Sequence, residues 1–189
     1  MWALVESGSV SKVFARPTKL ILGDVQYPSN IFELWTTAEL NAIKIYDVVQ
    51  DNTNKKDPEY YTNTNVSYAF QSSVTINSTN YTNVVVASYG TATAKTLSDL
   101  KTSHCAIVDN QAYSLLLPND WMVVKATETS GTVASDWTTY RTGVRTAAQS
   151  MKTKINAVSD VDALAALYVY NDADPPVRPL GEFPDAPSS

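Results

Sequence analysis

Only two neighbouring residues are strong candidates for nucleophilic chemistry. The 189-residue sequence has one histidine and one cysteine, His104 and Cys105. A nucleophile needs its base within hydrogen-bonding distance, but neighbouring side chains on a helix point about 100° apart. One histidine and one cysteine also exclude the usual zinc ligand sets. We therefore expect a hydrogen-bonded His104 at the edge of the core, a buried and unreactive Cys105, and no metal.

Carboxylates offer a second kind of chemistry, because glycoside hydrolysis needs only an acid and a base carboxyl at a suitable separation. Asp47, Asp51, Asp57 and Glu59 lie near one polar segment. A solvated acidic loop has the same composition, so a carbohydrate-active enzyme stays a distant alternative. The six glycines are dispersed, and no phosphate-binding loop occurs. We expect a protein that is not an enzyme and has no cofactor.

The segment Asp51-Asn-Thr-Asn-Lys-Lys-Asp-Pro superficially resembles a calcium-binding loop. Such a loop has glycine at its sixth position and a bidentate glutamate at its twelfth. Lys56 and Thr62 occupy those positions here. The prediction is therefore a polar turn.

Composition narrows the class of partner. The net charge is -5 and the pI about 4.8, and Lys and Arg do not cluster as phosphate binding requires. We therefore expect neither nucleic acid nor a membrane as a partner. Charged residues make up 17% of the chain, below the roughly 25% of typical soluble domains, and Asn, Thr and Ser replace them. An uncharged polar surface loses little on desolvation, which favours contacts with neighbouring subunits.

The first third of the chain predicts strands around one short helix. In residues 1–28 short apolar runs alternate with turn residues, which is typical of a meander of three or four strands. Thr36 and Glu39 have capping-box spacing, and Trp35 can pack on Leu40 of the helix that follows. Residues 45–49 return to strand character.

Residues 59–90 are rich in Tyr, Val, Thr and Asn and predict a long hairpin. Val66, Tyr68 and Phe70 alternate with polar residues, and the turn is expected at residues 77–80. Tyrosines on strands usually form cross-strand packing pairs. A sugar-binding platform is the functional alternative.

The second half predicts a helical hairpin. Apolar residues recur on one helix side over residues 100–116, and again with a period near 3.6 over residues 137–155. A short third helix follows at residues 161–168. The expected caps are Ser98, Ser135 and Ser159, and Pro118 is expected to end the first helix.

Two Asp-Trp pairs lie at the turn between the long helices. After Pro118 we expect the chain to turn and Trp121 to return as an apolar anchor. Asp136 falls in the first turn of the next helix, where the helix dipole favours an anion. Arg141 and Arg145 are four residues apart and are expected to face outward together.

The predicted architecture is an α+β fold with an extended proline-rich arm. The arm sequence ADPPVRPLGEFPDAPSS is unsuited to the interior of a helix or sheet. The predicted parts are a β-rich module at residues 1–58, a hairpin segment at 59–92, a helical module at 93–170 and the arm at 171–189.

Several motifs resemble those of tailed-phage tail-fibre proteins and tail-fibre assembly chaperones. In the second half they are Asp120-Trp121, Trp137-Thr-Thr-Tyr140-Arg141 and Arg145. In the first half they are MWALVESGSV, Arg16-Pro17, VQYPSNIF and Trp35-Thr-Thr-Ala-Glu39-Leu40, followed by Ile43-Lys-Ile. The chain is also similar to small virion proteins of marine phages that join both modules, a group that PLGEFP fits. The resemblance covers residues 1–50 and 112–183, whereas the segment 59–90 and the proline-rich end depart from it.

The resemblance implies a non-enzymatic virion protein of the tail, baseplate or fibre-attachment region, assembled in the host cytoplasm. Its partners would be other virion proteins, such as tail or fibre subunits, and copies of itself. An assembly chaperone that binds the fibre tip is the first alternative. A capsid decoration or receptor-binding protein is the second.

For this function we expect contacts through edge strands, tyrosines and the arm. Tyrosine provides a large contact area for a small loss of entropy, and extended segments dock readily on neighbours. The candidate contact residues are Tyr60, Tyr61, Tyr68, Tyr81, Tyr89, Arg141, Arg145, Pro175, Pro176, Arg178, Pro179, Leu180 and Phe183.

Overall fold

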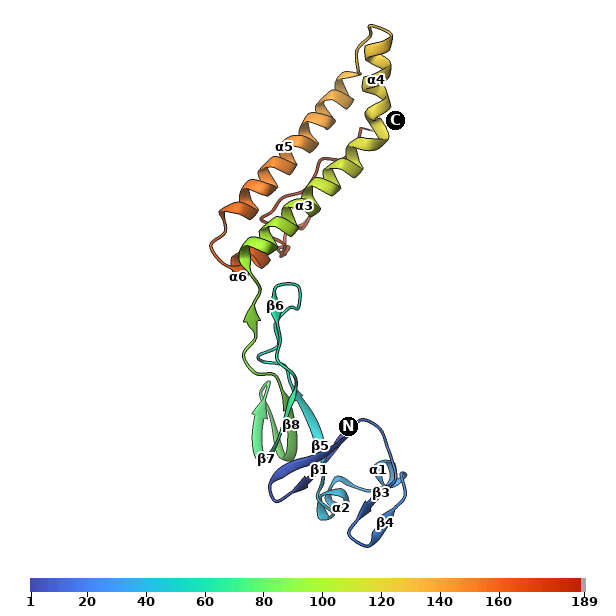
Figure 1. Cartoon of the computed structure of the whole chain (residues 1–189), viewed down its shortest axis with the longest axis vertical. Helices are drawn as coiled ribbons and strands as arrows, with labels where there is room; N and C mark the ends of the chain where they lie inside the picture. Colours follow the sequence, from blue (N-terminus) through green and yellow to red (C-terminus); the bar gives the residue numbers. More distant parts are fainter. Residues whose placement is uncertain (188–189) are drawn as a thin grey trace. The chain divides into compact units, whose positions relative to one another are not determined.

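The chain forms two compact units, shown in Figure 1. A computed structural model describes residues 1–187. The first unit, Met1–Thr93, holds the long strands, and the second begins at Ala94 and holds the long helices. This confirms the predicted α+β class. The boundary lies one residue from the one expected between the hairpin segment and the helical module.

The first unit is built on a five-stranded sheet with the strand order β2-β1-β5-β8-β7. All ladders are antiparallel except that of β5 with β8, which is parallel. Strands β2 and β7 also approach each other, so the sheet curls toward closure. The elements are β1 (Trp2–Glu6), β2 (Ser9–Phe14), β3 (Leu20–Leu22), β4 (Val25–Tyr27), α1 (Ile31–Leu34), α2 (Thr37–Ala42), β5 (Ile45–Asp51), β6 (Tyr61–Thr62), β7 (Ser67–Ile76), β8 (Thr79–Ser88) and β9 (Thr93–Ala94).

The strands of residues 1–28 form two separate hairpins. β1 and β2 belong to the large sheet, whereas β3 and β4 form a two-stranded sheet of their own. Strand β5 takes the place beside β1. The two hairpins are joined through a core under the sheet that also contains α1 and α2. This core consists of Phe14, Leu20, Ile31, Phe32, Leu40 and Ile45.

The predicted capping box of α2 is confirmed. The backbone N–H of Glu39 donates to Thr36 Oγ1 over 3.3 Å, and the backbone N–H of Thr36 donates to Glu39 Oε2 over 2.7 Å. The Thr36 hydroxyl also donates to Glu39 Oε2, over 2.8 Å. The two bonds that the Glu39 carboxylate accepts, from the Thr36 backbone N–H first and then from the hydroxyl, favour its ionised form and lower the pKa of Glu39. Trp35 packs against the same core as Leu40, as expected.

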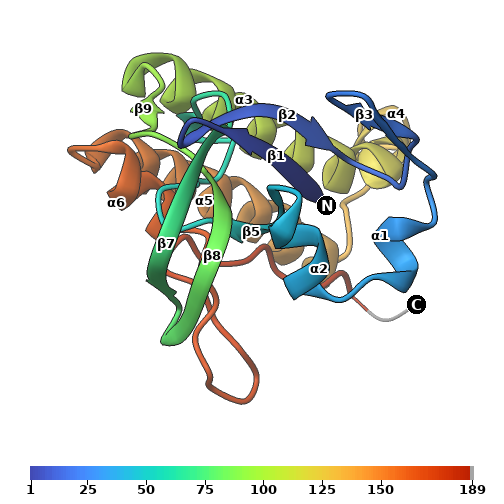
Figure 2. The same ribbon diagram turned by 90° about the horizontal axis from the view of Figure 1, so that it is seen from below.

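The predicted hairpin is also confirmed, with β7 and β8 side by side in Figure 2. Asn77 and Ser78 form its turn and both have positive φ, at 47° and 65°. Such φ values are typical of the two-residue turns that match strand twist. The hairpin is not a separate part, because Val48 to Asp51 of β5 pair in register with Val85 to Ser88 of β8. Residues 1–58 and 59–92 therefore share one sheet.

The second unit is a hairpin of two long helices with short helices at its ends (Figure 1). The buried residues follow the predicted period, with Val108 on the first long helix and Val144, Met151 and Ile155 on the second. Leu164 is fully buried. The elements are α3 (Leu97–Leu116), the 3-10 turn η1 (Leu117–Asn119), α4 (Asp120–Glu128), α5 (Ser135–Ala157) and α6 (Val161–Ala166).

The first long helix, α3, ends at Leu116, two residues before Pro118, as predicted, but the chain does not then turn out of helical structure, contrary to prediction. Pro118 lies in the first turn of η1, and α4 follows directly. Proline is tolerated there because the first N–H groups of a helix have no intrahelical acceptor. The carbonyls of Leu115 and Leu116 accept instead from the side chains of Asn119 and Arg141. The helical path therefore continues past the proline.

The helix caps lie one or two residues from the predicted serines. The N-cap positions are Thr96, Ala134 and Asp160, of which only Asp160 uses its side chain. Its carboxylate accepts from the backbone N–H of Ala163 over 2.8 Å, and this bond is the main cause of a lowered Asp160 pKa.

Candidate functional site

His104 serves the core of the helical unit, as predicted. It is 3% exposed, and its Nδ1 lies 2.7 Å from the hydroxyl of Tyr168. Cys105 is half-buried, where full burial was expected. Across residues 1–187, no group of three or more His, Cys, Asp or Glu side chains is placed to hold a metal ion. None of the helices described there is long and apolar enough to cross a membrane.

A row of exposed apolar side chains runs along α3, η1 and α4. It consists of Tyr113, Leu117, Trp121 and Val124, here called the apolar stripe, which are 61%, 52%, 56% and 56% exposed. Their spacing of four, four and three residues places them on one side of a nearly continuous helix. Scattered apolar residues are ordinary on a surface, but a contiguous patch marks a contact site.

The stripe corrects the expectation that Trp121 is an apolar anchor inside the fold. Its ring lies on the surface, and Lys125 Nζ lies 5.7 Å from the ring centroid. An open hollow beside the ring extends to Val133 and Trp137, between α4 and the start of α5. A hollow therefore lies directly beside the stripe, and a side chain of a partner can fill it.

Arg141 of α5 forms hydrogen bonds with the segment that carries the stripe. Its guanidinium donates to Asn119 Oδ1, to the carbonyl of Leu116 over 3.3 Å and to Asp120 Oδ1 over 2.7 Å. The Arg141 side chain is 9% exposed, whereas that of Asp120 is 49% exposed. The three acceptors lie in the segment that carries Leu117 and Trp121, so one side chain of α5 holds the stripe's backbone in place.

The outward orientation predicted for the two arginines is wrong for Arg141 and right for Arg145. Arg145 is exposed, and its guanidinium donates to the carbonyl of Arg141 over 3.4 Å. Helical spacing alone places both on neighbouring positions. Arg141 turns inward because η1 presents the acceptors described above.

The five candidate tyrosines do not share one environment. Tyr60 is buried in the first unit, so it is not a surface residue. Tyr61 and Tyr89 are half-buried, and Lys56 and Lys55 lie 5.6 Å from their respective ring centroids. The β7–β8 register pairs Tyr68 with Ala87 and Tyr81 with Val74, at different levels of the hairpin. Of the five, only Tyr68 is counted as exposed, at 37%.

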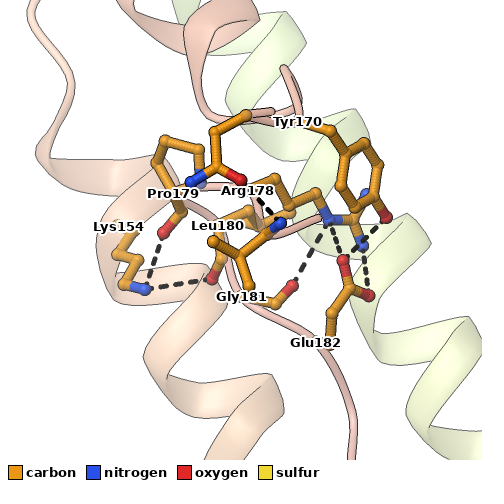
Figure 3. A network of polar contacts seen from close by, with 9 residues as sticks. Lys154, Tyr170, Arg178, Pro179, Leu180, Gly181 and Glu182 are labelled. Carbon is orange, nitrogen blue, oxygen red and sulfur yellow. Dashed lines mark hydrogen bonds and ion pairs between the residues drawn. The ribbon is translucent and has the colours of Figure 1, made fainter. Parts of the chain in front are cut away.

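The arm folds back on its own helical unit, as the close view in Figure 3 shows. Leu180 is 2% exposed, so in this structure its side chain is buried against its own chain. Arg178 and Phe183 are half-buried, whereas Pro175, Pro176 and Pro179 are exposed. The arm thus docks on its own chain in this structure, whereas docking on a neighbouring subunit was expected.

Sequence reasoning missed the first half of the stripe and the role of Lys154 in holding the arm. The signal for Tyr113 and Leu117 was their spacing with Trp121 across Pro118, which was hidden because the chain was expected to turn after the proline. No family model, curated protein or solved structure matches this chain.

Proposed function

We propose that this protein is a non-enzymatic structural component of a tailed-phage virion. It acts in the tail, baseplate or fibre-attachment region through contacts with neighbouring subunits. The apolar stripe is the observation that carries the proposal. The resemblance of residues 1–50 and 112–183 to tail-fibre and fibre-assembly proteins supports the phage setting.

The chemistry of the stripe suits a contact site. Trp and Tyr are enriched among the residues that dominate binding energy, and burial of apolar surface contributes about 25 cal/mol per Å². Trp121 lies centrally in the stripe, with Leu117 and Val124 beside it. A partner that covers these side chains removes apolar surface from water.

The stripe is also held ready for binding. Its backbone is helical, and Arg141 joins the segment around Pro118 to α5 through the hydrogen bonds described above. A surface that is already ordered loses little conformational entropy when a partner binds. The buried Arg141 thus holds in place the segment whose exposed apolar side chains make the proposed contact.

Quantitative mass spectrometry of purified phage particles tests the proposal. A fixed number of copies per particle, relative to the major capsid and tail proteins, is the expected result. Presence in infected cells together with absence from finished particles would contradict it and leave the assembly chaperone.

A variant pair tests the stripe itself. Trp121→Ser should lower incorporation into particles, because the central contact of the stripe is lost. Ile21→Ser is the matched control, since Ile21 is 66% exposed on the first unit and lies outside the stripe. Circular dichroism should show both variants folded. Equal incorporation of the two variants would remove the stripe from the proposed contact.

A further inference from the structure

The arm is bound to the helical unit as a peptide is bound to a groove. Lys154 Nζ donates to the carbonyls of Pro179 over 2.7 Å and of Leu180 over 3.1 Å. The backbone N–H of Leu180 donates to the carbonyl of Leu167 over 2.9 Å, and its side chain is buried. Further along, the arm lies beside Ile107 and Leu115 of α3, and Pro184 reaches Gly143 of α5.

The docked part of the arm has a shape of its own. The backbone N–H of Gly181 donates to the carbonyl of Arg178 over 3.0 Å, and Gly181 has a φ of 95°, which favours glycine. Arg178 Nε forms an ion pair with Glu182 Oε1 at 2.7 Å (Figure 3). These contacts are internal to the arm, so they stay with it wherever it docks.

The first part of the arm, residues 171–177, is here called the tether, and its hydrogen bonds are local. Asn171 Oδ1 accepts from the backbone N–H groups of Ala173 and Val177, and the Asn171 N–H donates to the carbonyl of Val177 over 2.9 Å. Residues 171–177 are all exposed. The tether's ends therefore meet, although a chain of this length spans about 20 Å when extended. Its length exceeds what docking in the chain's own groove requires.

We propose that the groove between α3 and α5 takes the docked part of the arm, residues 178–184, of a second copy of this chain. The contacts that hold the arm are the same whether the arm comes from its own chain or from an identical one. Exchange of an identical element is a low-cost route to assembly, since only the connecting segment changes conformation. Here that segment is the exposed tether.

The surroundings of the tether fit such an exchange. Val169 and Tyr170 directly precede the tether and are 65% and 50% exposed, and Val177 at its end is 50% exposed. They leave apolar surface beside the tether that a second copy can cover. The proposal concerns how copies of this chain join, and it holds in whichever particle or complex they do so.

Cross-linking between two full-length chains tests the exchange. A Cβ built at Gly143 lies 3.8 Å from Cβ of Pro184, which matches the separation in disulfides. One tagged chain carries Cys105→Ala, Gly143→Cys and Pro184→Ala, and one untagged chain carries Cys105→Ala and Pro184→Cys. The two are co-expressed, purified under reducing conditions and then oxidised. Non-reducing gels measure the mixed dimer.

The matched control places the tagged chain's cysteine at Thr142 instead of Gly143, because Thr142 is the exposed neighbour on the same helix. Exchange predicts at least about tenfold more mixed dimer with Gly143→Cys, since a docked cysteine has an effective concentration near millimolar. Adding Leu180→Asp to the arm chain should remove that excess. Equal yields from the two cysteine positions would overturn the proposal.

A single chain with Cys105→Ala, Gly143→Cys and Pro184→Cys checks the docking geometry. It should form a disulfide within one chain or between chains, and failure to form either would also overturn the proposal. These outcomes are read on purified protein. Failure of exchange is thus distinguishable from absence of the protein from phage particles.

Discussion

The two units differ in how their interiors are built. The core clusters of the first unit are apolar, as in the group formed by Ala3, Val5 and Val85 between strands. In the part of the chain that the structure describes, all three buried polar or charged residues belong to the helical unit: His104, Asn119 and Arg141. Each of them has a hydrogen-bond partner.

The difference follows from the kind of secondary structure that each unit contains. A sheet satisfies its backbone groups through its own ladders, so the space between elements can be apolar. The helical unit contains η1 with Pro118, which has no backbone N–H to donate, and the carbonyls of Leu115 and Leu116 there accept from side-chain donors. Two of the three buried polar residues, Asn119 and Arg141, thus lie where a helix lacks backbone donors, and the same two residues position the apolar stripe.

The largest expected effect is a loss of apolar packing in the first unit. Ile45 is fully buried in the core that joins the β3–β4 hairpin to the large sheet. Ile45→Ala should lower the free energy of unfolding of this unit by about 2–5 kcal/mol, because it removes buried surface and leaves a cavity. Hydrogen exchange measured by mass spectrometry should show faster exchange in residues 1–93. Equal acceleration in the helices would contradict the independence of the two cores.

A polar substitution should have the next largest effect, and it should act on the helical unit. Arg141→Met leaves Asn119 Oδ1 and the carbonyl of Leu116 without their donor, so we expect a loss of about 2–3 kcal/mol in chemical denaturation. Arg145→Met is the control, because this exposed arginine should change stability by less than about 0.5 kcal/mol. Similar losses of stability in the two variants would contradict a specific contribution from the buried hydrogen bonds of Arg141.

Removal of the α2 cap should have a smaller effect on the first unit. Thr36→Ala loses the side-chain acceptor for the Glu39 N–H and should lower stability by about 1 kcal/mol. The Glu39 carboxylate accepts hydrogen bonds from the backbone N–H and the hydroxyl of Thr36, and these bonds lower its pKa. The stability that these two bonds contribute is therefore present above the unfolded pKa. It should disappear as the pH falls through the folded value. Denaturation at several acidic pH values checks this, and the variant should lose less stability on acidification than the native chain.

The smallest effect is expected at the arm. The Tyr170 hydroxyl donates to Glu182 Oε1 over 2.7 Å, and this bond is the main cause of a raised Tyr170 pKa. The contact is therefore fully present below the unfolded value near 10 and is lost as the pH rises through the higher folded value. Tyr170→Phe should speed amide exchange in residues 178–182 at neutral pH. Tyr113→Phe, an exposed change in the stripe, should leave the arm's exchange unchanged.

Local patterns were predictable because neighbouring residues supply all of their contacts. The capping box of α2 needs only Thr36 and Glu39, and the turn of the long hairpin needs only Asn77 and Ser78. The period of α5 identified its buried side for the same reason, since Val144 and Met151 are repeats along one helix. These features depend on short separations along the chain.

The tertiary structure decided the contacts that join distant segments. It placed β8 beside β5, turned Arg141 inward and docked Leu180 on its own unit. In each case the residue's own pattern is compatible with two outcomes, exposed or paired. The choice depends on which acceptors or apolar side chains a distant segment presents, and only the folded chain specifies that.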